Sequence, residues 1–139
     1  MKIDSPAEAC AALAAIIVAA DELGTTEERK FLFETVRALP IFQGLDHGQF
    51  KKLMSDTTEE LYASFPMDGA RVSSDGVGRL VDMIRDALPA ERRAEALEAA
   101  VGLARSDGVT SVEALLLQRL CEGLDLDAAA ASRLLGRIA

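Results

Sequence analysis

Acidic side chains recur in two short segments that lie near opposite ends of the sequence. The first segment reads Asp-Glu-Leu-Gly-Thr-Thr-Glu-Glu over residues 21–28, and the second reads Asp-Gly-Val-Thr-Ser-Val-Glu over residues 107–113. When Thr25 is aligned with Thr110, the glutamates three residues later also fall in register. Carboxylate oxygens are the ligands that hard divalent cations prefer. The repeat therefore makes cation binding the first chemistry to consider.

Some of these acids occupy positions at which a helix disfavours negative charge. Ala-rich runs over residues 9–20 and 94–104 precede the two segments and predict helices that end just before the acids. An anion at a helix C-terminus costs about 0.3–1 kcal/mol, and a bound cation would offset this cost. Oxygen ligands favour Ca²⁺, Mg²⁺ or Mn²⁺ over Zn²⁺. The candidate metal ligands are Asp21, Glu22, Glu27, Glu28, Asp107 and Glu113.

The same residues also fit a structural role that requires no metal. Thr25 with Glu28, and Thr110 with Glu113, have the Ser/Thr-x-x-Glu spacing of a helix capping box. Each such cap stabilises a helix by ~1 kcal/mol. The alternative prediction is therefore a metal-free helical scaffold for protein–protein interaction, in which the acids cap helices or meet a basic partner.

Neither acidic segment fits the calcium loop of an EF-hand. That loop needs oxygen ligands at its first, third and fifth positions and a glutamate at its twelfth. Counting back from Glu28 places Ile17 and Ala19 at the first two ligand positions, and counting back from Glu113 places Gly102 and Ala104 there. These residues have no side-chain oxygen, so the EF-hand is excluded.

The elements that must position these acids are all predicted to be helices. Apolar residues recur at helical spacing throughout the chain, and no alternating strand pattern occurs. We expect an all-α fold, a compact bundle of about seven helices, with one domain over residues 1–139 and no linker. The repeat predicts two pseudo-symmetric helical hairpins, which could bring the acidic turns together. The longest loop is expected over residues 67–73, and Gly123 is expected as the glycine that follows the sixth helix.

The composition excludes several classes of function. The formal charge is −8, and Lys and Arg do not cluster, so binding to nucleic acid is not expected. The run over residues 9–20 is too short to span a bilayer and lacks a basic segment before it, so we expect a cytoplasmic protein without direct membrane insertion. Cys10 and Cys121 are expected to be buried, reduced thiols.

No arrangement of residues typical of an enzyme occurs in the sequence. His47 is the only histidine and cannot form a zinc site of the usual kind alone. The chain has neither a Gly-x-Ser-x-Gly elbow nor a glycine-rich phosphate loop followed by Lys. We therefore predict that the protein is not an enzyme.

The duplicated pattern of an Ala-rich helix followed by an acidic turn resembles the tellurite-resistance TerB-like family, over about residues 9–126. The same helical domain is similar to the membrane-proximal segment of some DnaJ-like co-chaperones. The first copy has Asp21 and Glu28 seven residues apart, as in the family, but has Glu22 where the family has Gly. The second copy is one residue shorter, so Asp107 aligns with Glu22. The resemblance implies a bacterial cytoplasmic stress-response module that binds a divalent metal through these acids and joins protein partners in membrane-associated complexes.

Overall fold

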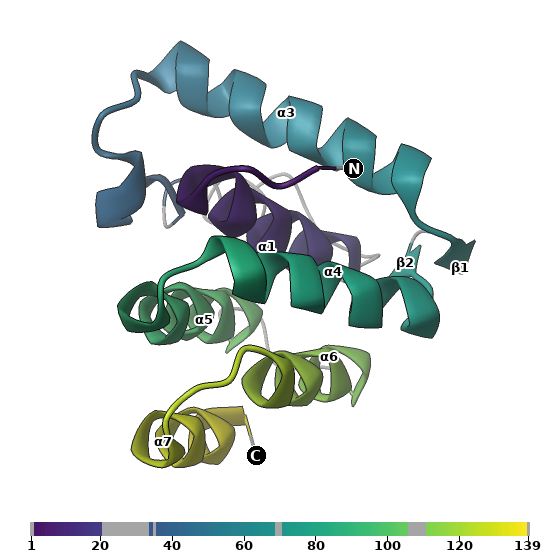
Figure 1. Cartoon of the computed structure of the whole chain (residues 1–139), viewed down its shortest axis with the longest axis vertical. Helices are drawn as coiled ribbons and strands as arrows, with labels where there is room; N and C mark the ends of the chain where they lie inside the picture. The colour runs from purple at the N-terminus through teal and green to yellow at the C-terminus, as the bar shows by residue number, and fades with distance from the viewer. Residues whose placement is uncertain (1, 21–33, 35, 69–70, 106–110, 139) are drawn as a thin grey trace.

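The computed structural model describes residues 2–20, 34, 36–68, 71–105 and 111–138 (Figure 1). Within these ranges the chain forms six α-helices, one 3-10 turn and one short β-hairpin, so the predicted all-α fold is confirmed. In chain order the elements are α1 (Pro6–Ala20), η1 (Pro40–Phe42), α3 (His47–Ser64), β1 (Met67–Asp68), β2 (Arg71–Val72), α4 (Ser74–Ala87), α5 (Ala90–Arg105), α6 (Ser111–Gly123) and α7 (Ala128–Ile138). The start of the helix that the Thr25 and Glu28 capping box predicts falls outside the described ranges.

Side-chain caps begin the helices where the sequence indicates. At the start of α1, the Glu8 amide donates to Ser5 Oγ over 3.2 Å, and the Asp4 amide donates to Glu8 Oε2 over 3.4 Å. At the start of α3, Asp46 and Gln49 form a reciprocal capping box with distances of 2.9 and 2.8 Å. Each cap satisfies amide groups that lack a partner within the helix, which fixes where the helix begins.

The loop predicted over residues 67–73 contains a short hairpin. Strands β1 and β2 pair antiparallel, with Met67 opposite Val72 and Asp68 opposite Arg71. The Ser73 hydroxyl then accepts a hydrogen bond from the Gly76 amide over 3.3 Å and caps α4. Two-residue strands are too short to show an alternating pattern, which is why the sequence did not indicate them.

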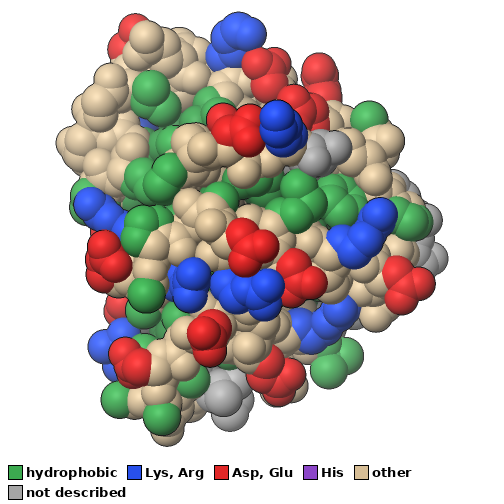
Figure 2. Space-filling model, viewed as in Figure 1, with side chains coloured by type: hydrophobic (Ala, Val, Ile, Leu, Met, Phe, Trp, Pro, Cys, Tyr) green, Lys and Arg blue, Asp and Glu red, His purple; other side chains and the backbone are tan. Residues whose placement is uncertain are grey.

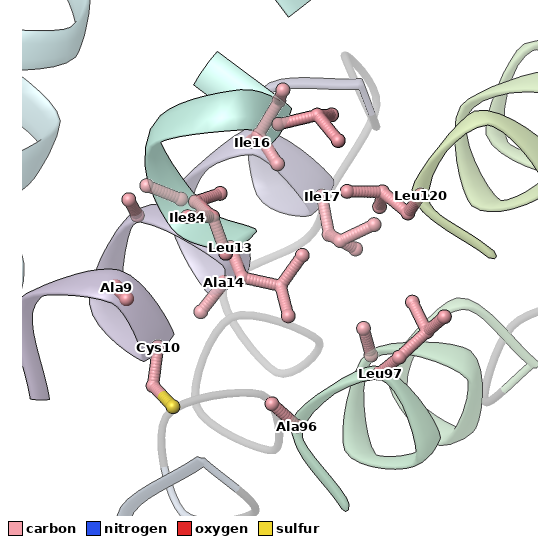
Figure 3. Close-up of a cluster of buried hydrophobic side chains, with 14 of the residues drawn as sticks. Ala9, Cys10, Leu13, Ala14, Ile16, Ile17, Ile84, Ala96, Leu97 and Leu120 are labelled. Carbon is pink, nitrogen blue, oxygen red and sulfur yellow. The ribbon is translucent and has the colours of Figure 1, made fainter. Parts of the chain in front are cut away.

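Helix α1 forms the centre of the hydrophobic core. Every residue from Ala9 to Ile17 is buried, with at most 5% of its surface exposed. The helix packs against α3, α4, α5 and α6, and also against η1 and β2. Figure 3 shows α1 side chains pointing in several directions, with Ile17 near Leu120 of α6 and Cys10 on the side of Ala96 of α5. A helix that is apolar nearly all round can be stable only in such a position.

The end of α6 corrects the predicted role of Gly123. The residue with left-handed backbone is Asp125, with φ of 54°, whereas Gly123 is the last residue of the helix itself. A Cβ atom on Gly123 would collide with the side chain of Val81, which is buried in α4. Glycine is therefore needed here for the close approach of α4 and α6 and not for the turn. Asp127 then caps α7, with its Oδ1 accepting from the Ala130 amide over 2.8 Å.

Candidate cation site

The structure places the helices that lead into the two acidic segments but describes almost none of the acids themselves. Five predicted ligands, Asp21, Glu22, Glu27, Glu28 and Asp107, lie outside the described residues. Glu113 is in the first turn of α6, where the backbone is described but the side chain is not. The predicted ligand set therefore stays a prediction. No group of three or more His, Cys, Asp or Glu side chains in the described parts of the chain is arranged to hold a metal ion.

The helices before the two segments run in the same direction. α1 and α5 are in contact, and in Figure 1 both run from left to right. α1 ends at Ala20 and α5 ends at Arg105, so the chain leaves both helices toward the same end of the bundle. The aligned acids follow these two points in the sequence. The two helix ends thus point to the same end of the bundle, although the sequence separates them by most of its length.

The second copy of the repeat is a helical hairpin, as predicted. α5 and α6 are in contact and run in opposite directions, and the segment 106–110 connects them (Figure 1). The corresponding partner of α1 in the first copy lies mostly outside the described residues. The pseudo-symmetry of the two hairpins is therefore visible only in α1 and α5.

The electrostatics at the end of α1 are those that a cation would offset. The last turn of α1 contains no basic residue, and its partial negative charge at the carbonyl end is not compensated by a nearby side chain of the helix. The sequence continues directly with Asp21 and Glu22. A donor set made only of carboxylates has the chemistry that Ca²⁺, Mg²⁺ or Mn²⁺ binds.

The two thiols are part of the core, and their surroundings favour the protonated form. Both Cys10 and Cys121 are free and buried, as predicted. The pKa of the Cys10 thiol is raised to about 11, mainly by burial and also by the nearby Glu95 carboxylate, while the guanidinium of Arg92 opposes this shift. Burial and Glu122 also raise the pKa of Cys121. A thiol that keeps its proton is a poor nucleophile and a poor metal ligand.

One surface feature was not predicted from the sequence. A groove of about 680 Å³ lies between α4 and α6, and most of the side chains that line it are charged. On α4, Asp75, Arg79 and Asp82 recur at a spacing of four and then three residues, which places them on one face of a helix. This spacing is the sequence signal that could have indicated the groove. A charged helix face usually only contacts solvent, so the spacing alone does not predict one.

None of the described helices combines the length and hydropathy that a membrane-spanning helix requires. The model of the family described as tellurite resistance protein TerB matches residues 7–135, which is nearly the whole chain. No curated protein and no solved structure shows significant similarity to the chain. Because the match includes both Ala-rich helices and both acidic segments, the chain belongs to the family of the tellurite resistance protein TerB.

Proposed function

We propose that this protein is a non-enzymatic, cytoplasmic stress-response module that binds a divalent cation through its two acidic segments and docks to protein partners. The observation that carries the proposal is the parallel packing of α1 and α5, whose C-terminal ends point to the same end of the bundle. Membership of the TerB family supports a role related to tellurite resistance.

The two helix ends give a physical reason for a cation at this end of the bundle. Each contributes a partial negative charge, and the sequence adds Asp21 and Glu22 after one and Asp107 after the other. α1 has no basic residue in its last turn, whereas α5 ends with Arg105, so the negative charge at the end of α1 has the least compensation. Negative groups that gather repel one another, and a divalent cation replaces this repulsion with attraction. Glu27, Glu28 and Glu113 belong to the first turns of the helices that follow in the predicted hairpins and complete the proposed ligand set.

The first test measures thermal stability after the protein has been stripped with EDTA and then titrated separately with Ca²⁺, Mg²⁺, Mn²⁺ and Zn²⁺. We expect a saturable rise in Tm with one of the first three ions. A ligand that binds only the native state at about 100 times its Kd adds about 2.7 kcal/mol to the free energy of unfolding. Isothermal titration calorimetry with the same ion gives the affinity and the number of sites.

Matched variants connect the effect to the proposed ligands. The double variant Asp21→Asn/Asp107→Asn should lose the ion-dependent rise in Tm. The control variant Asp56→Asn/Asp86→Asn removes two exposed acids from α3 and α4 and should keep it. A Tm that responds to no ion, or a response that is the same in both double variants, would contradict cation binding.

The alternative is a metal-free interaction scaffold, which the capping boxes seen elsewhere in the chain favour. Asp46 and Gln49 form such a box at the start of α3 with their own side chains and backbone amides. On this alternative, Thr25→Ala and Thr110→Ala would each lower the free energy of unfolding by about 1 kcal/mol, and EDTA would change nothing. Melting curves of the wild type and these variants, with and without EDTA, therefore distinguish the cation-binding function from the metal-free scaffold.

A further inference from the structure

The groove between α4 and α6 presents unpaired charges of both signs to solvent. The buried faces of the two helices turn toward α1, and the groove lies on their outer side. Figure 2 shows acidic and basic side chains close together on this face of the molecule. The floor is formed partly by Gly78 and Gly123, which lack side chains that could fill the hollow.

The charges that line the groove do not pair with one another. Arg119 Nη1 contacts only the Ser74 hydroxyl, at 3.2 Å, and the Arg79 guanidinium lies 5.1 Å from the centre of the Phe65 ring. In the part of the chain that the structure describes, neither arginine forms an ion pair, and neither do Asp75 and Glu122. Four charged groups therefore face a groove without a partner of opposite sign.

The order of the charges along the groove follows from the contacts between its two walls. The Arg119 side chain reaches Ser74 and also lies over Gly78, where an added Cβ would be 3.3 Å from Nη2. About one helical turn further along both helices, Gly123 meets Val81. Asp75 therefore lies across the groove from Arg119, and Arg79 lies across from the region of Glu122. Asp75 and Glu122 therefore each have a base on the opposite wall at about the same height, whereas Asp82 pairs with Arg85 of its own helix at 3.2 Å.

We propose that this face binds a second copy of the same chain, related by a twofold axis that runs along the groove. Such an axis places α4 of one copy over α6 of the other, so each residue meets the residue that lies across its own groove. Asp75 then meets Arg119 of the second copy, and Arg79 meets Glu122 of the second copy. Each contact occurs twice by symmetry, so the dimer contains four ion pairs that the monomer does not.

The other occupants fit the charges less well. A small anion would meet Asp75, Asp82 and Glu122 as well as the two arginines, and a metal ion would meet the two guanidinium groups. Acidic and basic side chains alternate along the groove, so the matching partner surface must carry the opposite charge at each position. A second copy of the chain presents such a surface by symmetry. Leu115 lies on the same stripe of α6 as Arg119 and Glu122, is 63% exposed, and would add apolar area to the interface.

Sedimentation velocity at increasing protein concentration tests the proposal. Ion pairs at a solvated interface are screened by salt, so we expect a dimer at low salt that dissociates as the salt concentration rises. Arg79→Glu and Glu122→Arg should each weaken dimerisation about tenfold or more, because exposed pairs contribute about 0.2–1 kcal/mol each and each variant replaces two of them with repulsion. The double variant Arg79→Glu/Glu122→Arg exchanges the two signs and should restore the dimer.

A matched control is Glu60→Arg, which makes the same charge change as Glu122→Arg on an exposed part of α3. It should leave the sedimentation profile unchanged, and circular dichroism should show the same helix content for all variants. A wild-type chain that stays monomeric up to millimolar concentration at low salt would overturn the proposal. A dimer that responds equally to Glu60→Arg and Glu122→Arg, or that the double variant does not restore, would also overturn it. The cation site at the end of α1 and α5 does not enter this test.

Discussion

α1 and α5 have the same place in the sequence repeat but different environments in the fold. With Thr25 aligned on Thr110, they share one buried face, and all of its side chains are at most 5% exposed. In α1 this face comprises Ala11, Ala12, Ala15 and Ile16, which align with Ala96, Leu97, Ala100 and Val101 of α5.

A second face distinguishes the two helices. α1 has Cys10, Leu13 and Ile17 on this face, and all three are buried. The aligned residues of α5 are Glu95, Glu98 and Gly102, which are half-buried or exposed. On this side α1 lies against α5 and α6, with Cys10 toward Ala96 and Ile17 near Leu120 (Figure 3). Its remaining surface is covered by α3, α4 and the hairpin strand β2, whereas the main neighbours of α5 are α1, α6 and α7. The sequence repeat therefore accounts for the buried face that the two helices share, and the position of each helix in the bundle accounts for the burial or exposure of its second face.

The largest effect on the free energy of unfolding should come from giving α1 the residue of α5 at the aligned positions Leu13 and Glu98. Leu13→Glu places an unpaired carboxylate at a site that is 2% exposed, and we expect it to lower the free energy of unfolding by at least about 4 kcal/mol. Glu98→Leu removes an exposed ion pair with Arg133, at 3.6 Å, and should change it by less than about 1 kcal/mol. Urea unfolding measures both. Because Leu13→Glu could abolish folding, Leu13→Ala, at about 2–5 kcal/mol, provides a measurable second value. Similar effects of the two exchanges would show that α1 is not buried on both faces.

The next prediction concerns how the stability contribution of Cys10 depends on pH. The residue of α5 that aligns with Cys10 is Glu95, which is only half-buried. The unfolded thiol ionises near pH 9.0, and the native thiol keeps its proton to about pH 11, so the unfolded state loses its proton first. The contribution of Cys10 to stability is therefore complete below pH 9 and falls by about 1.4 kcal/mol for each pH unit between the two values. The difference in unfolding free energy between the wild type and Cys10→Ala should shrink as the pH rises from 8 to about 10. A difference that stays constant over this range would show that the thiol is not held in its protonated form.

The smallest expected effect is a gain in stability at Gly102, which aligns with Ile17. Nothing lies within 4 Å of a Cβ atom added at Gly102, and the residue is inside α5. Gly102→Ala should therefore raise the free energy of unfolding by about 0.5–1 kcal/mol. Gly123→Ala is the matched control and should lower it, because the new methyl group collides with Val81. Thermal melts of the two variants should shift in opposite directions.

The sequence predicts those parts of the fold that local chemistry decides. Ser5 and Asp46 are residue types that favour helix N-caps, and each begins a helix, while the apolar residues Ala9 to Ile17 of α1 are buried all round. The role of Gly123 could not be predicted, because it depends on contact with Val81, which is more than forty residues away in the sequence. The hairpin of β1 and β2 was missed because its strands have only two residues each.

The candidate site was predictable as a set of residues but not as an arrangement. Alignment of the repeat identifies the acids, from Asp21 to Glu113, without any structure. The structure shows only that the helices before the two acidic segments, α1 and α5, run in parallel, and this arrangement is set by the tertiary packing of helices that no local pattern connects. The groove between α4 and α6 was missed for the same reason, since its two walls come from separate helices.

The central position of α1 has a consequence for the synthesis of the chain. α1 leaves the ribosome before α4, α5 and α6, which later cover its apolar surface. Until those helices emerge, a segment of Ala, Leu and Ile remains exposed to water and to other nascent chains. Contacts between elements so distant in sequence also slow the final collapse. A chaperone that binds this segment before the second half of the chain is complete would therefore protect the nascent chain from aggregation.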